Sequence, residues 1–210
     1  MNCCYEDRAR ANGYLNVAGV DEVGRGPLAG PVVVAAVILP IDFNPIGIND
    51  SKKMTQKARD REYERIISSA IDYSIAIIDS DIIDSLNILN ATHKAMKDAL
   101  SNLKIQPDFA LIDGLYVDGL PCKSSAIVGG DSKCLSIACA SILAKVTRDN
   151  IMNEYHIKYP QYCFNRNKGY GTKDHIDALK KYGPCPIHRY SFAPVRERAK
   201  SCVLPNLNLD

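Results

Sequence analysis

Four acidic residues come at the ends of short apolar runs in this sequence: Asp21, Glu22, Asp113 and Asp131. In α/β sheets ligands bind beyond the ends of strands, so we expect these carboxylates to meet there although they are far apart in the chain. Clustered carboxylates repel one another and raise their pKa values unless a cation holds them together. Oxygen donors without His or Cys favour Mg²⁺ or Mn²⁺, so the pattern predicts a site for divalent metal ions.

Each acid also has a plainer interpretation. A single acidic residue is more often a cap or a turn residue, and Asp131 stands just ahead of a predicted helix, where an N-cap belongs. Neighbouring residues of a strand point to opposite faces, so Asp21 and Glu22 cannot both point inward from a regular strand. The strand must end or twist there, which Gly24 permits, or Glu22 must contribute its backbone oxygen.

A glycine-rich stretch, GRGPLAG, begins two residues after Glu22. Its spacing is one residue longer than the dinucleotide-binding pattern, and it leads into the apolar run VVVAAVIL rather than into a helix. The pair Gly19 and Gly24 has the spacing of a P-loop, but Arg25 and Gly26 stand where Lys and Ser or Thr are needed. Glycines instead allow backbone amides to approach a sugar-phosphate chain, with Arg25 supplying charge; a tight turn is the alternative.

Charge is unevenly distributed along the chain. Residues 132–200 contain 13 Lys or Arg against 5 Asp or Glu, although the 210-residue chain carries a net charge of only +2. An acidic part that holds carboxylates and a basic part suit a metal-using enzyme with a polyanionic substrate. An uneven solvated surface gives the same numbers, so charge alone does not choose between the two.

The eight cysteines form no CxxC pair and no Cys/His spacing of zinc type. We therefore expect free thiols in a reducing compartment rather than structural zinc. The amino terminus lacks the apolar segment of a secretory signal. The longest apolar run, residues 32–39, is far shorter than the roughly 20 residues of a membrane-spanning helix. These features predict a cytoplasmic protein.

The apolar patterns predict alternating strands and helices. Strands are expected at residues 17–20, 32–39, 73–80, 108–113 and 124–130, and helices within residues 49–70, at 86–103 and at 132–149. The second helix carries one stripe, which Pro107 ends: Leu86, Leu89, His93, Met96, Leu100 and Leu103. His93 is expected to be a core or boundary residue. This order predicts an α/β domain over residues 1–150, a basic helical extension over 151–200 and a disordered tail over 201–210.

Six segments, in the expected order, resemble the signatures of the type II ribonucleases H, most closely the bacterial ribonuclease HII family. They are GVDEVGRGPLAGPVVVAAVIL, NDSKKMT, NILNATHKAM, LIDG, GGDSKCLSIACASILAKVTRD and KGYGTKDHIDALKKYGPCPIHRYSFAPV. Together they cover nearly the whole chain, from about residue 6 to residue 195. The resemblance implies a ribonuclease H-like fold, which is a mixed β-sheet flanked by helices, with a small carboxy-terminal helical extension.

The resemblance also implies roles for individual residues. The family's four metal-binding and catalytic acids fall on Asp21, Glu22, Asp113 and Asp131, which would hold two divalent ions, Mn²⁺ or Mg²⁺. Gly24, Arg25 and Gly26 look like the loop that grips the nucleic-acid backbone, and Tyr170 looks like the tyrosine that stacks on a sugar and helps to sense the 2′-hydroxyl. Several basic residues are candidates for phosphate contacts, each with an ordinary surface role as the alternative: Lys52, Lys145, Arg148, Lys168, His188 and Arg189.

The implied substrates are RNA/DNA hybrids and DNA duplexes that contain ribonucleotides. Cleavage on the 5′ side of the ribonucleotide would leave 5′-phosphate and 3′-hydroxyl ends, in ribonucleotide removal from DNA and RNA primer removal. We expect a monomer with no obligate protein partner and no membrane association. One departure is Gly129, where the family usually has Lys next to the acid, so metal or substrate affinity can differ.

Features of the sequence oppose two other classes of function. A nucleic-acid-binding module that has lost catalysis would lack one of the four acids, and all four are present. A nucleotide-binding transferase is opposed by the glycine spacing described above. The sequence therefore favours a metal-dependent nuclease.

Overall fold

The computed structural model describes residues 3–202, with side chains as far as residue 199. The chain divides into two compact units. The first contains the segments up to residue 23, 33–77 and 92–147; the second contains 24–32, 78–91 and the chain from 148 onward. The last segment of the second unit thus begins three residues before the start predicted for the helical extension. The second unit also includes two earlier segments, so the predicted consecutive domains remain a prediction.

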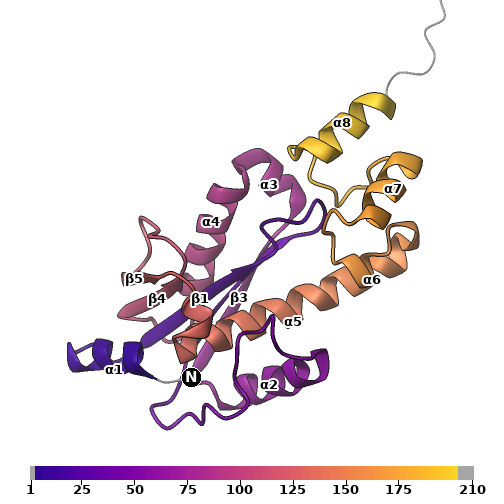
Figure 1. Cartoon of the computed structure of the whole chain (residues 1–210). Helices are drawn as coiled ribbons and strands as arrows, with labels where there is room; N and C mark the ends of the chain where they lie inside the picture. The colour runs from indigo at the N-terminus through magenta and orange to yellow at the C-terminus, as the bar shows by residue number, and fades with distance from the viewer. Residues whose placement is uncertain (1–2, 203–210) are drawn as a thin grey trace, which may run out of the picture. The chain divides into compact units, whose positions relative to one another are not determined.

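Within the described residues, the strands form one mixed five-stranded sheet in the order β3-β2-β1-β4-β5 (Figure 1). The strands are β1 (Val17–Val23), β2 (Val32–Ile38), β3 (Asp72–Ile78), β4 (Phe109–Asp113) and β5 (Lys123–Ile127). β1 pairs antiparallel with β2 and parallel with β4, and β4 pairs parallel with β5. β2 is buried along its whole length, which explains its unbroken run of β-branched and small residues.

Helices flank this sheet in the first unit (Figure 1). They are α1 (Cys4–Ala11), α2 (Gln56–Ser69), the greater part of α4 (Ile88–Ser101), the short 3₁₀ helix η1 (Gly130–Ser132) and the first half of α5 (Leu135–Lys158). The side chain of Thr55 caps α2 by accepting the N–H of Ala58. The first turn of α5 is capped from elsewhere, because Oε1 of the buried Glu6 accepts the N–H of Ser136 at 2.7 Å.

The contact between α5 and β1 leaves no space for a side chain at Gly19. A Cβ atom built there would lie 2.2 Å from the carbonyl carbon of Ser136 and 2.5 Å from the amide nitrogen of Ile137. The small residues that follow in α5, Ala138 to Ala140, are completely buried. Small residues on both elements therefore allow the helix backbone to lie directly on the strand.

The second unit contains the helices predicted for the carboxy-terminal extension. These are η2 (Pro160–Tyr162), α6 (Phe164–Asn167), α7 (Lys173–Tyr182) and α8 (Ala193–Cys202), and the unit also includes the short α3 (Ser80–Leu86). Its core is built on Tyr162 and Phe164, whose stacked ring centroids lie 5.3 Å apart, together with Met152 and Ala29. The mixed sheet flanked by helices and the helical extension are thus confirmed.

Two predicted details differ from the structure. The helix expected from Leu86 onward is broken at Asn87, whose φ of 67° no helix interior allows, so α3 ends and α4 starts there. Leu86 and Leu89, the first members of the predicted apolar stripe, are exposed, whereas Met96 and the later leucines are buried. His93 is half-buried, as expected of a boundary residue. The tail predicted over residues 201–210 falls outside the described residues from 203 on, and residues 201 and 202 belong to α8.

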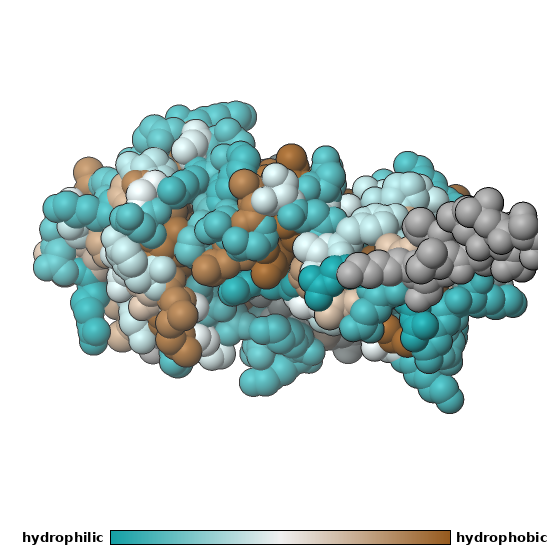
Figure 2. All heavy atoms as spheres, turned by 90° about the horizontal axis from the view of Figure 1, so that it is seen from above, coloured by the Kyte–Doolittle hydropathy of each residue, from teal (hydrophilic) through white to brown (hydrophobic). Residues whose placement is uncertain are grey.

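The visible surface is mainly hydrophilic, with apolar groups between the polar residues (Figure 2). Some of the exposed large apolar residues lie in loops, among them Leu15 and Leu115. Across the residues that the structure describes, no helix is both long enough and apolar enough to cross a membrane.

Replacing Gly19 with Ala should destabilise the protein strongly. The added methyl group meets backbone atoms, which cannot rotate away, so we expect a loss of about 3 kcal/mol in the free energy of unfolding, at the upper end of overpacking costs. Urea denaturation measures this loss. Gly26→Ala is the matched control, because a Cβ there would meet its nearest neighbour at an ordinary 3.7 Å. Equal stability of the two variants would contradict the close helix–strand contact.

Candidate active site

The four predicted acids lie at the carboxyl ends of adjacent strands in the first unit. Asp21 lies on β1 and Asp113 ends β4, and because the parallel register pairs Val20 with Ile112, the two aspartates follow at the same step of neighbouring strands. β1 runs through Asp21 and Glu22, which occupy successive positions, and ends one residue later. Asp131 lies in η1, shortly after β5. The sheet therefore brings acids from distant parts of the sequence to one edge.

Backbone N–H groups donate hydrogen bonds to two of these carboxylates. Asp21 Oδ1 accepts the N–H of Glu22 at 2.7 Å, and Asp113 Oδ1 accepts the N–H of Gly130 at 2.6 Å. The second bond ties the end of β4 to the residue before Asp131. A Cβ at Gly130 would lie 2.6 Å from Cδ1 of Ile137, so a larger residue at this junction would require the Ile137 side chain to move.

Asp21 is buried, and its environment disfavours the charged form. Burial raises the pKa of the Asp21 carboxyl well above its usual value, and repulsion from Glu22 and Asp113 raises it further. Hydrogen bonds from Ser141 and from the amide of Glu22 oppose this shift without cancelling it. An acid at the centre of like charges has a strong electrostatic need for a cation.

Lys52 supplies one positive charge at this edge. Its Nζ lies 3.2 Å from Oδ2 of the buried Asp131, although most of the lysine side chain is exposed. Partial burial lowers the pKa of Lys52, but the hydrogen bond and the charge of Asp131, with a smaller contribution from Asp21, raise it overall. The residue predicted to contact a phosphate therefore also neutralises one of the acids, which sequence spacing gave no reason to expect.

Whether a divalent ion fits this edge depends on the type of donor atoms and on how close the side chains lie to one another. Among the described residues, no three Asp, Glu, His or Cys side chains lie close enough together to hold a metal ion as they stand. The carboxylates of Asp113 and Asp131 are instead bonded to Gly130 and Lys52. The donor set nevertheless consists of carboxylate oxygens, which Mg²⁺ and Mn²⁺ prefer, around an acid whose raised pKa reports uncompensated charge. The residues fit the ions in chemical type, and these hydrogen bonds occupy one oxygen each of Asp113 and Asp131.

The second unit holds the other predicted site residues. The loop of residues 24–32 contains Gly24, Arg25 and Gly26, of which Arg25 and Gly26 are exposed. Gly24 has a φ of 97°, and a Cβ there would lie 2.3 Å from Nε of Arg148, so both conformation and space require glycine. A Cβ at Gly26 would lie 3.7 Å from Cε1 of Tyr170. The structure thus places the predicted loop and the half-exposed Tyr170 ring side by side.

Arg189 shapes this loop from inside the protein. Its guanidinium is completely buried and donates only to backbone oxygens, those of Gly24 at 2.6 Å, Arg25 at 2.9 Å, Pro27 at 2.8 Å and Gly30 at 2.8 and 3.0 Å. These bonds use all five N–H groups of the side chain. One arginine therefore fixes the path of most of the loop.

Arg148 supports the same loop from the helix side. Its Nε donates to Pro31 O at 2.9 Å, and its other nitrogens donate to Ala29 O at 3.1 Å and Lys168 O at 2.9 Å. Burial lowers the pKa of Arg148 to about 10 and, together with repulsion from Arg148, that of Arg189 to about 9, so both remain charged at neutral pH. The hypothesis that Arg148, His188 and Arg189 contact phosphate directly is wrong, because all three are buried against the protein.

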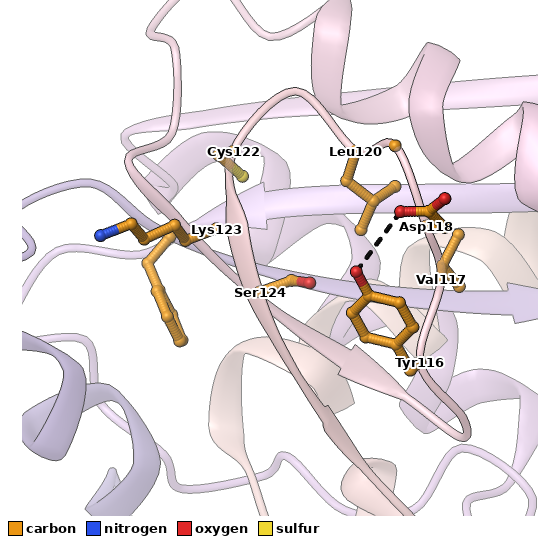
Figure 3. Close-up of a pocket in the computed structure, with 9 residues that line it drawn as sticks. Tyr116, Val117, Asp118, Leu120, Cys122, Lys123 and Ser124 are labelled. Carbon is orange, nitrogen blue, oxygen red and sulfur yellow. Dashed lines mark hydrogen bonds between the residues drawn. The ribbon is translucent and has the colours of Figure 1, made fainter.

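A separate pocket of about 520 Å³ lies in the first unit along the β4–β5 connection (Figure 3). Tyr116 and Asp118, whose side chains are 3.5 Å apart, line it with Lys123 and Ser124. None of the predicted site residues lines this pocket. Its concave shape therefore does not mark the carboxylate edge.

Comparisons with known proteins find relatives over most of the chain. A family model described as Ribonuclease HII matches residues 18–195. A protein named Ribonuclease HII from Acetivibrio thermocellus is 56% identical over 190 residues, which is 90% of this chain and 74% of that protein. One of the same name from Oceanobacillus iheyensis is 54% identical over 200 residues, 95% of this chain and 77% of that protein. The crystal structure of ribonuclease H2 from Pyrococcus horikoshii OT3 is similar with a TM-score of 0.78 and 27% identity, over 89% of this chain and 98% of that one.

Replacing Asp21 with Asn should stabilise the metal-free protein at neutral pH. The folded-state pKa of Asp21 is raised, so the wild type loses stability as the pH rises from about 4, the unfolded value, through the folded pKa. Asn cannot ionise, so this loss disappears. Melting temperatures measured in EDTA between pH 4 and 8 should fall less steeply with pH for Asp21→Asn than for the wild type. Parallel curves would contradict the electrostatic interpretation.

Replacing Arg189 with Lys should destabilise the protein, because the loop of residues 24–32 loses most of its hydrogen bonds from this side chain even though the positive charge is kept. An ammonium group has three donors at one point and cannot reach four separated carbonyls, so buried oxygens lose partners at about 1–3 kcal/mol each. We expect a loss of about 3 kcal/mol or more in urea denaturation. Arg196→Lys, at an exposed position of α8, is the matched control and should change stability by less than about 0.5 kcal/mol. Similar small losses in both variants would disprove the role given to Arg189.

Proposed function

Because this chain belongs to the ribonuclease HII family, we propose that it hydrolyses the RNA strand of RNA/DNA hybrids and cuts duplex DNA on the 5′ side of embedded ribonucleotides. Family membership makes the chain a metal-dependent nuclease of the ribonuclease H class. The proposal goes beyond the family in two respects, which are cleavage at single ribonucleotides and the two-metal-ion mechanism. It is supported above all by the convergence of the strand-end acids around Asp21.

We assign catalysis to the acids of the first unit, Asp21, Glu22, Asp113 and Asp131. Two Mg²⁺ or Mn²⁺ ions bound there would supply Lewis acidity for the attack of water on phosphorus and for the departure of the 3′ oxygen. Because water attacks rather than the 2′-hydroxyl, the products carry 5′-phosphate and 3′-hydroxyl ends.

The protein's own contribution is to hold these oxygens in place and to control their charge. Before a cation binds, the Asp21 carboxyl keeps its proton to a higher pH than an ordinary aspartate does. Lys52 holds the Asp131 carboxylate, and its exposed ammonium can also approach a phosphate of the substrate. The charge of Lys52 thus serves both the acid and the polyanion.

We assign substrate recognition to Gly24, Arg25, Gly26 and Tyr170. The glycines present backbone close to the surface, Arg25 supplies charge for a phosphate, and the neighbouring Tyr170 ring offers a flat face and a hydroxyl to the sugar. The 2′-hydroxyl distinguishes RNA from DNA at a given site. A polar group of the protein that hydrogen-bonds the 2′-hydroxyl loses its partner when the sugar is a deoxyribose. This loss costs roughly 1–3 kcal/mol, which is enough to favour the ribonucleotide.

The remaining parts of the proposal follow from the family and from charge. The excess of Lys and Arg over residues 132–200 suits phosphate binding, which makes affinity fall steeply with salt. Removal of ribonucleotides and RNA primers from DNA, a cytoplasmic location and a monomer without an obligate protein partner belong to the same proposal.

Cleavage of a DNA duplex that carries one ribonucleotide tests the proposal. With Mg²⁺ or Mn²⁺, the wild type should cut on the 5′ side of the ribonucleotide and should also degrade the RNA strand of a hybrid. Asp21→Asn should reduce the rate by roughly 10²–10³-fold, the loss typical of one electrostatic stabiliser. Asp177→Asn makes the same chemical change at an exposed position of α7 and should leave the rate unaltered. An uncut substrate with the wild type under both metals would refute the function.

A further inference from the structure

Two buried histidines of the second unit form a direct pair. His175, on α7, and His188 are 0% and 1% exposed, and their Nε2 atoms lie 3.0 Å apart. They lie among aromatic side chains, with Tyr162 and Phe164 ring centroids 4.9 to 6.2 Å from theirs. Apolar residues would fill such a core at lower cost, so a polar pair here calls for a reason.

The partners of the pair fix where its protons lie. The N–H of Cys185 can only donate, and at 2.9 Å it is nearer to Nδ1 of His188 than the Cys185 carbonyl oxygen is at 3.3 Å, so we assign Nδ1 as an acceptor and place the proton of His188 on Nε2. This proton is donated to Nε2 of His175. His175 then carries its own proton on Nδ1, 2.9 Å from the carbonyl oxygen of Tyr170, which can only accept. Each end of the chain demands the same order of protons.

This order holds only for neutral rings. Burial lowers the pKa of His175, and burial together with the neighbouring His175 lowers that of His188 to about 4. A second proton on either ring would face another donor. The pair is therefore neither a phosphate-binding cation nor an acid or base at neutral pH, but an oriented chain of hydrogen bonds.

The side-chain hydrogen bonds of the pair end at the Tyr170 carbonyl and at the Cys185 N–H, and the backbone of His188 continues from the pair to the loop of residues 24–32. At one end His175 holds the backbone of Tyr170. At the other, His188 forms a β-bridge with Ala29 of the loop, and the neighbouring backbone bonds Arg189 N–H to Leu28 O at 2.9 Å and Gly30 N–H to Ile187 O at 2.8 Å extend it. A further bond joins Leu28 N–H to Gly169 O at 2.8 Å, one residue before Tyr170. The histidines thus connect the loop to the tyrosine.

We propose that His175 and His188 are positioning residues that set the Tyr170 ring against the loop of residues 24–32 and thereby determine selectivity for a ribonucleotide. This inference rests on the proposed function, since it requires Tyr170 to contact the sugar. Buried polar networks in which every donor and acceptor is paired favour one arrangement over its alternatives. A tyrosine that distinguishes one 2′-hydroxyl from a hydrogen atom requires such a fixed position.

A double-mutant cycle between His175 and Tyr170 tests the proposal. His175→Leu keeps the side-chain volume but removes the donor to the Tyr170 carbonyl, so it should lower kcat on the single-ribonucleotide duplex by about tenfold, the scale of a misplaced group, with little change in KM. In the Tyr170→Ala background the same substitution should change kcat by less than about twofold, because the group it positions is gone. Losses that multiply would show a role independent of Tyr170 and overturn the inference.

Rescue separates positioning from general stability. His175→Asn places an amide N–H near the position of Nδ1, so it should keep kcat within about threefold of the wild type even where urea denaturation shows lost stability. Asp177→Asn on the same helix is the control for activity. If His175→Leu does not fold, His188→Leu interrupts the chain at its other end, and the cycle with Tyr170→Ala has the same expected and contradicting results.

The two proposals fail in different ways. A wild-type protein that leaves the ribonucleotide-containing duplex intact refutes the proposed function. A wild type that cuts it, with a His175→Asn variant no more active than His175→Leu, refutes only the positioning role.

Discussion

Charge that is withdrawn from water must be compensated, and the two units of this protein meet that constraint in opposite ways. In the first, Asp21 is buried beside Glu22 and Asp113, so its environment increases the need for positive charge. In the second, the guanidinium groups of Arg148 and Arg189 are buried and donate their hydrogen bonds to backbone carbonyl oxygens. Carbonyls stabilise a guanidinium without cancelling its charge. One unit thus attracts cations, and the other keeps a positive potential suited to a polyanion.

The separation follows the sequence closely at one point. Only Val23 stands between Glu22 of the acidic edge and Gly24 of the arginine-supported loop. The residues assigned to catalysis and those assigned to recognition therefore belong to units with different cores. Along the chain, a single residue connects the two groups. The requirement for glycine at position 24, set by a positive φ and by the Arg148 side chain, lies at this link.

The acids and the fold class were predictable because both depend on local patterns: an apolar run predicts a strand, and an acid at its end lies at the edge of the sheet. The roles of Arg148, His188 and Arg189 were not. Loop carbonyls up to 165 residues away in sequence surround the two arginines, and His175 and aromatic rings surround His188, so a basic residue in a polar stretch looks like surface. The break at Asn87 was missed for a related reason, since a 3.6-residue periodicity continues through a single residue with positive φ. The metal-binding role of the four acids remains a prediction.

The contact of Gly19 with the backbone of α5 has a consequence for motion. Because a Cβ at Gly19 would lie 2.2 Å from the backbone of Ser136, no side chain fits between strand and helix there, and separating the two elements exposes both backbones together. Amide hydrogens in β1 and in the first turns of α5 should therefore exchange with solvent through one shared opening. Asp21 lies on the same strand, so its backbone takes part in this shared opening.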